Sequence, residues 1–133
     1  GDMVFKGNDD GTEITALTLD MSAAGAATFN NNVTAFSDER LKSDITTLKS
    51  SLEKVLQMRG VSYVRNDNVE GGEQIGVIAQ ELETVSPKLV RESEDGMKTV
   101  SYSILYMKAI KALQEAQTRI ETLEAEVAAL KAK

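Results

Sequence analysis

The last part of the chain places the strongest constraint on the fold. From about Ser103 to Lys133 it contains no glycine and no proline, and apolar side chains recur in three heptads. These side chains are Leu113, Ile120 and Val127 at position a, and Ala116, Leu123 and Leu130 at position d. Such an apolar seam is stable in water only when other apolar groups cover it. The pattern predicts a helix over residues 103–133 that joins a coiled coil.

Charged residues beside the seam favour parallel helices. Arg119 at position g faces Glu124 at the following position e of a parallel partner, and Glu126 faces Lys131 in the same way. The heptads leave open whether two or three helices associate. The alternative is a single helix on the surface of its own domain, which does not account for the agreement between seam and flanks.

Composition narrows the chemistry and the partners. The 133 residues carry a formal net charge of -6, which disfavours a nucleic-acid partner, and include no cysteine and no histidine. Disulfides, thiolate metal sites and the usual general base are excluded, so any proton transfer falls to lysine or a carboxylate. There is no secretory signal, no long apolar run and no cofactor motif. We predict a soluble chain that binds no cofactor and no membrane.

The first third of the chain alternates like short β-strands. Apolar residues recur at period two at Met3 and Phe5, at Leu17 to Met21, and over Phe29–Ala35. Turns are expected at residues 7–11 and 22–25. The Asn8–Gly11 stretch also suggests an EF-hand calcium loop, but Lys6 and Leu17 then occupy ligand positions, so a hairpin turn is preferred and no metal is predicted. Identical neighbours are expected to cover this thin meander of two to four strands.

The sequence pattern over roughly residues 45–101 predicts a small α+β body. Ile45, Leu48, Leu52, Val55 and Leu56 are spaced for one helix face, with Ser43, Thr46 or Thr47 as caps and Gly60 as the stop. Strands are expected over residues 61–64 and 74–78, with a loop over 66–72 between them. A short helix over residues 79–85 ends before Pro87, and residues 89–92 and 97–101 form a hairpin.

Ser37 and Lys42 are the one nucleophile and base pairing that stands out. With no histidine present, a serine hydroxyl can still be activated by a desolvated, neutral lysine amine. A serine and a lysine five residues apart are common in any sequence, so spacing alone indicates an exposed linker as readily as a catalytic pair.

Several motifs carry a resemblance to a known family. Residues 37–45 (SDERLKSDI), 60–63 (GVSY), 75–82 (IGVIAQEL), 86–90 (SPKLV) and 100–103 (VSYS) occur in order with suitable gaps. This stretch, about residues 37–133, resembles the C-terminal intramolecular chaperone of phage tail fibres and tailspikes, the self-cleaving endosialidase type. The strands before Ser37 resemble the end of a fibre stalk more weakly.

The resemblance implies a division of the chain and a self-cleavage reaction. Residues 1–37 would be the end of the β-rich stalk, residues 38–102 an α+β body and residues 103–133 the helix of a parallel trimeric coiled coil. The cut would fall between Ser37 and Asp38, with Ser37 and Lys42 as a catalytic dyad. Further residues at motif positions are expected to support the site: Arg40, Asp44, Gln80 and Glu81.

The implied setting is a phage tail fibre precursor assembled in the host cytoplasm. Its partners would be two further copies and the upstream fibre segment of the same chain, and the chaperone domain would be released after cleavage. Attack of Ser37 on its own carbonyl forms a strained four-membered ring, whereas attack on the preceding carbonyl cuts before Ser37. A water activated by Lys42, or a hydroxyl of another subunit, avoids both problems, and the sequence leaves these routes open.

Two other functions remain open. The chain could be a trimeric fibre tip that never cuts, or the self-cleaving release module of a membrane-tethered transcription factor. The glycine-rich strands before Ser37 favour a fibre. A conventional enzyme acting on external substrates is disfavoured, since no cofactor loop or second catalytic cluster is found.

Overall fold

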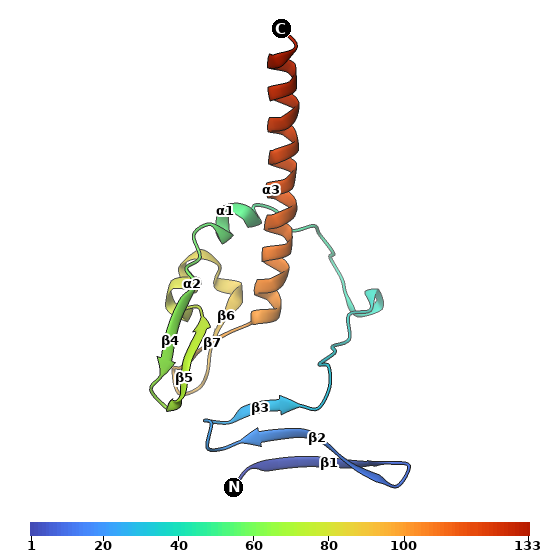
Figure 1. Cartoon of the computed structure of the whole chain (residues 1–133), viewed down its shortest axis with the longest axis vertical. Helices are drawn as coiled ribbons and strands as arrows, with labels where there is room; N and C mark the ends of the chain where they lie inside the picture. Colours follow the sequence, from blue (N-terminus) through green and yellow to red (C-terminus); the bar gives the residue numbers. More distant parts are fainter. The chain divides into compact units, whose positions relative to one another are not determined.

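The computed structural model describes all of residues 1–133, and its mixed α+β character confirms the predicted fold class (Figure 1). The chain separates into two compact units, Gly1–Ile45 with Ser62–Ile75, and Thr46–Val61 with Gly76–Lys133. No helix is both long enough and apolar enough to cross a membrane. The boundary expected at residue 37 stays a prediction.

A three-stranded antiparallel sheet begins the first unit. Its strands are β1 (Met3–Asp9), β2 (Thr12–Asp20) and β3 (Ala26–Phe29), in the order β1-β2-β3. Phe5 lies opposite Leu17, which in turn lies opposite Phe29, so the predicted alternation places apolar side chains on one face. Phe5 and Phe29 are 50% and 49% exposed, and this apolar face is therefore uncovered.

Two details of the predicted meander are wrong. The third strand ends at Phe29, and residues 30–38 form no regular structure. The backbone N–H of Asn32 donates to the side chain of Asn31 at 2.7 Å, a local bond that competes with strand pairing. The first turn is also shorter than predicted, because β1 continues to Asp9 and only Asp10 and Gly11 turn, with φ of 48° and 88°.

Strands β4 (Val61–Arg65) and β5 (Asn68–Gly76) form a separate two-stranded sheet and run in opposite directions (Figure 1). The predicted first strand is confirmed, but the loop predicted over 66–72 is wrong, since only two residues separate the strands. Gly72 has φ of 71°, which glycine adopts without strain, so β5 continues through an irregular position.

The second unit holds the core of the molecule. Leu82, Leu89 and Val90 are buried, and five partly buried apolar residues pack against them: Met58, Val77, Ala79, Val100 and Leu105. These residues come from α2 (Ala79–Val85), the 3₁₀ turn η2 (Pro87–Leu89), the hairpin β6 (Val90–Glu92) and β7 (Lys98–Val100), and α3 (Tyr102–Lys131), with neighbouring loops. The predicted short helix and hairpin are both confirmed.

Helix α1 (Ser51–Val55) is much shorter than the helix predicted between a cap at Ser43, Thr46 or Thr47 and a stop at Gly60. Ser50 has φ of 55°, a left-handed conformation that cannot continue a helix toward Ile45, and Ile45 remains 65% exposed. None of the predicted side-chain caps is used, and the helix ends at Val55, before Gly60.

Helix α3 confirms the predicted long C-terminal helix. Its length is about 45 Å at 1.5 Å per residue, and Ala112 is its only buried residue. The predicted seam residues in the C-terminal part of α3 have about half or more of their surface exposed. The exposed fractions are 48% for Ile120, 59% for Leu123, 48% for Val127 and 67% for Leu130. Within one chain, therefore, roughly half or more of each of these four side chains remains exposed to solvent.

Candidate active site

The side chain of Lys42 folds back onto Ser37. Its Nζ lies 2.6 Å from Ser37 Oγ and 2.8 Å from the carbonyl oxygen of Ser37. This carbonyl belongs to the peptide bond between Ser37 and Asp38, the bond at which cleavage is expected. One amine therefore contacts both the candidate nucleophile and the carbonyl of the candidate scissile bond.

A single 3₁₀ turn, η1 (Glu39–Leu41), brings the two residues together. The backbone N–H of Leu41 donates to the carbonyl of Asp38 at 3.1 Å, and that of Lys42 to the carbonyl of Glu39 at 3.0 Å. Lys42 itself is extended, with φ of -127° and ψ of 144°. The turn reverses the chain so that a side chain five residues along returns to its start.

Asp38 begins this turn and is tightly bound. Its Oδ1 accepts the backbone N–H of Arg40 at 2.9 Å, while the Arg40 side chain donates to both carboxylate oxygens at 2.9 Å each. The hydrogen bond from the Arg40 guanidinium, followed by that from its backbone, lowers the pKa of Asp38 below its ordinary value. The same pairing raises the pKa of Arg40.

In the single chain, Ser37 and Lys42 are exposed to solvent. All residues from Asn30 to Ser50 are exposed, including both members of the pair. Phe36 and Leu41 are 96% and 68% exposed, and with Asp38 and Arg40 they line a surface hollow. Two large apolar side chains thus flank the pair without being covered.

Of the other predicted supporting residues, one lies close to Lys42 in sequence and two belong to the second unit. Asp44 lies two residues beyond Lys42, with a left-handed φ of 54°. Gln80 and Glu81 belong to α2 in the second unit. Glu81 accepts two hydrogen bonds from Arg59, at 3.0 Å and 2.5 Å, which lower its pKa and raise that of Arg59.

Arg59 is a residue that sequence reasoning missed. It lies 22 residues from Glu81, a separation that follows no helix or strand period. A pairing of this kind arises from the tertiary fold.

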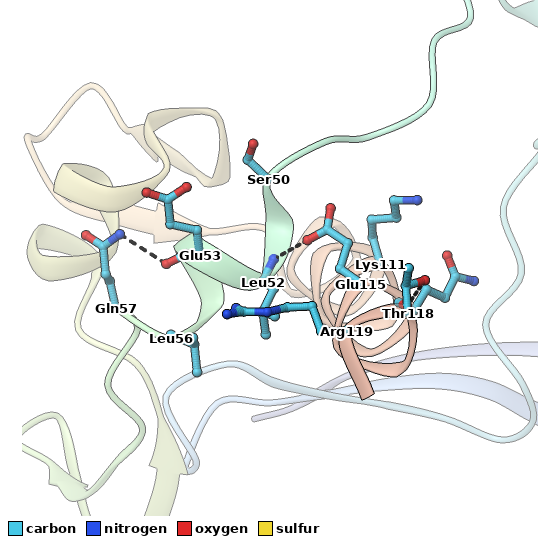
Figure 2. A pocket seen from close by; sticks show the side chains of 10 residues that line it. Ser50, Leu52, Glu53, Leu56, Gln57, Lys111, Glu115, Thr118 and Arg119 are labelled. Atoms are coloured by element: carbon cyan, nitrogen blue, oxygen red, sulfur yellow. Dashed lines mark hydrogen bonds between the residues drawn. The ribbon is translucent and has the colours of Figure 1, made fainter. Parts of the chain in front are cut away.

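A second missed feature is an open groove of about 610 Å³ between α1 and α3 (Figure 2). Leu52 and Leu56 form part of its wall, and the charged side chains Glu53, Lys111, Glu115 and Arg119 surround it. Figure 2 shows Glu115 reaching from α3 to the start of α1. Its carboxylate accepts the backbone N–H of Ser51 at 3.2 Å and that of Leu52 at 2.6 Å.

No group of three or more carboxylates is placed to hold a metal ion. At the stretch that suggested calcium, the side chain of Asn8 instead accepts the backbone N–H of Gly11 at 2.8 Å. The hairpin turn preferred from the sequence is confirmed by this bond and by the β1–β2 pairing.

Sequence comparison connects this geometry to a family. Residues 37–91 match the family model described as chaperone of endosialidase, whose name classes it among peptidases. The match begins at Ser37, the residue that Lys42 contacts, and it includes α2 and its Gln80 and Glu81.

Phage tail fibre proteins are also similar in sequence. The chain is 37% identical over 104 residues to the long tail fiber protein Gp37 of Enterobacteria phage K3, and equally to that of Enterobacteria phage T2. The long tail fiber protein Gp37 of Salmonella phage S16 is 33% identical over 106 residues. These alignments cover 72%, 72% and 75% of this chain, which spans 8%, 8% and 14% of the length of those relatives. Through residues 37–91, this chain belongs to the chaperone of endosialidase family.

Proposed function

We propose that this chain is an intramolecular chaperone of a phage tail fibre. It joins three copies, assists folding of the β-rich fibre segment ahead of Ser37, and then frees itself by cutting its own backbone between Ser37 and Asp38. The family description supports the chaperone role, and the tail fibre relatives support the fibre setting. The product remains in the virion tail, and the chaperone domain is released from a precursor assembled in the host cytoplasm.

One observation carries the cleavage part of the proposal. Lys42 Nζ contacts both Ser37 Oγ and the carbonyl oxygen of the bond to be cut. As an ammonium it polarises that carbonyl, and as a neutral amine it accepts a proton from the hydroxyl. Contact with the carbonyl of Ser37, rather than that of Phe36, supports a cut after Ser37.

The net reaction is a hydrolysis. It consumes one water, breaks the C–N bond between Ser37 and Asp38, and leaves a carboxylate on Ser37 and an amino group on Asp38. Lys42 receives a proton from the attacking O–H group, a water or a hydroxyl of another subunit, as that oxygen bonds to the Ser37 carbonyl carbon, and it passes the proton to the departing nitrogen of Asp38. Apart from this water, no group outside the chain is needed to balance these steps.

Association of the chains would create the conditions for this reaction. A lysine is a base only in its neutral form, which burial favours because an ammonium loses its hydration. In one chain the pair is exposed, and so are the adjacent Phe36 and Leu41. Packing of neighbouring subunits over these two side chains would exclude solvent from Ser37 and Lys42, so cleavage would follow assembly.

The exposed seam of α3 supports parallel association of like copies, and the number three rests on the family resemblance. Complete burial of an exposed apolar side chain of this size contributes about 1.5–3 kcal/mol. Ile120, Leu123 and Val127 are exposed by roughly half on each chain, so covering each of them contributes about half of that range. The uncovered face of β1–β3, with Phe5 and Phe29, is a second surface for like copies to cover.

The order of events follows from folding physics. Long intertwined β-fibres depend on non-local pairings and are prone to register slips, so they nucleate slowly. A helical trimer forms from local contacts and aligns three chains first. Cutting then removes the nucleus, and the fibre is kinetically trapped because refolding would need the lost domain.

The test is the mass of the purified chain under denaturing conditions. We expect fragments 1–37 and 38–133 from the unchanged chain, and a single uncut mass from Ser37→Ala and from Lys42→Ala, each still a trimer by sedimentation. Lys49→Ala, which removes a nearby lysine, should cut normally. If the unchanged chain forms an uncut trimer, the alternative function, a fibre tip that does not cleave, is favoured. Normal cutting of Lys42→Ala would exclude Ser37 and Lys42 as the catalytic dyad.

A further inference from the structure

We propose that Asp38 is a positioning residue, whose side chain caps the turn that returns Lys42 to Ser37. This inference rests on the proposed self-cleavage and assigns a task to the residue that follows the cut. Asp38 touches neither Ser37 Oγ nor Lys42 Nζ in the hydrogen bonds of this site, so its effect passes through the backbone.

The cap is visible in the geometry of the turn. Asp38 has φ of -59° and ψ of 140°, outside helical values, and its side chain accepts the N–H of Arg40. Aspartate is among the preferred residues at this position because its short side chain reaches the N–H two residues ahead. The turn is only three residues long and buries none of them, so it has little else to hold it.

The turn sets how far Lys42 lies from Ser37. Its Nζ meets two atoms of Ser37 at 2.6 Å and 2.8 Å, a placement that depends on chain reversal over residues 39–41. If the turn opened, the lysine would lose both contacts at once. A misplacement of about 1 Å is enough to slow a positioned reaction by about 100-fold.

Arg40 keeps the carboxylate of Asp38 engaged. It donates to both oxygens, so the negative charge is paired within the turn and does not draw the Lys42 amine away from Ser37. Glu39, the other acid of the turn, has no hydrogen bond through its side chain and serves as a matched control. The two neighbouring acids therefore differ in their contacts although they share exposure and charge.

The experiment compares substitutions that keep the cap with one that keeps the charge. Asp38→Asn and Asp38→Ser retain a capping oxygen on a short side chain, whereas Asp38→Glu retains the charge on a longer one. We expect the Asn and Ser variants to cut within about threefold of the unchanged rate, and the Ala and Glu variants to cut about five- to thirtyfold more slowly. Glu39→Ala and Glu39→Gln should cut at the unchanged rate.

Rates are measured as the growth of fragment 38–133 by intact mass, in trimers checked by sedimentation. Unchanged cutting of Asp38→Ala, or fast cutting of Asp38→Glu beside slow cutting of Asp38→Asn, would overturn the inference. Failure of the proposed function looks different, since cleavage would then be absent from the unchanged chain or would survive Ser37→Ala.

A second readout does not need cleavage. In the uncut Lys42→Ala chain, we expect the backbone amide proton of Arg40 to exchange with solvent more slowly than in the same chain carrying Asp38→Ala. Equal exchange in the two chains would show that Asp38 does not cap the turn, whatever the outcome of the cleavage assay.

Discussion

The carboxylate of Glu115 in α3 accepts the backbone N–H of Leu52 at 2.6 Å, across 63 residues of sequence, and thereby caps the start of α1. The N–H groups in the first turn of a helix have no partner inside the helix, and Ser50 supplies no side-chain cap here. Helix α1 therefore depends on α3 for the bond that its own sequence does not provide.

Replacing Glu115 should loosen α1 while leaving α3 helical. We expect faster amide hydrogen exchange over residues 51–56 in Glu115→Ala, because two backbone N–H groups lose their acceptor. Glu121→Ala, an equivalent change at an exposed site on the same helix, should leave α1 unaffected. Unchanged exchange in Glu115→Ala would show that packing alone holds α1.

The same contact predicts sensitivity to acid. The bonds from Leu52 and Ser51 lower the pKa of Glu115 below its ordinary value of 4.5. A carboxylate whose pKa is depressed by folding stabilises the folded state above its unfolded pKa, and this stabilisation is lost as the pH falls through the folded value. Protection of α1 amides should therefore persist at neutral pH and decline below about 4.5. In Glu115→Gln this part of the decline should disappear; an identical pH profile would contradict the assignment.

Lys42→Arg separates the two roles of the lysine. Arginine keeps the positive charge and the donors that polarise the Ser37 carbonyl, but it does not give up a proton in proteins. We expect cutting to slow by about 100-fold or more, the usual effect of losing a general base. The readout is the mass of the chain over time. Near-normal cutting would mean that Lys42 acts only as a hydrogen-bond donor.

A charge in the α3 seam should prevent both assembly and cutting. Leu123→Asp places a carboxylate at a d position, where burial without a partner is strongly unfavourable. We expect monomers by sedimentation and no cleavage product. Thr122→Asp introduces the same charge one residue away, outside the seam, and should give cleaved trimers. Efficient cutting by monomeric Leu123→Asp would show that the site does not require assembly.

Local patterns were sufficient to predict α2, the β6–β7 hairpin and α3, because period, turn residues and breakers lie within each element. The failure at α1 has a different cause. Ile45 and Leu48 fit a helical period, yet the helix starts only where Glu115 supplies acceptors, and that contact depends on the tertiary fold.

The candidate site shows the same division. The pairing of Ser37 with Lys42 came from resemblance, since their spacing is uninformative, and the structure adds the 2.6 Å contact and the turn that produces it. The pairing of Arg59 with Glu81 gave no sequence signal because strands β4 and β5 separate the two residues in the sequence. Sequence patterns predict the helices and strands, but they do not predict which side chains from different helices, strands and loops contact one another.

Ser37 and Lys42 lie on opposite sides of the peptide bond that they are proposed to break. Once that bond is cut, the hydroxyl stays with the preceding segment and the amine leaves with the following one. Each copy of the chain is thus limited to a single turnover, and neither product keeps both groups. A protease of this kind inactivates itself by its own cleavage reaction, so no separate inhibitor is needed to protect other proteins from it.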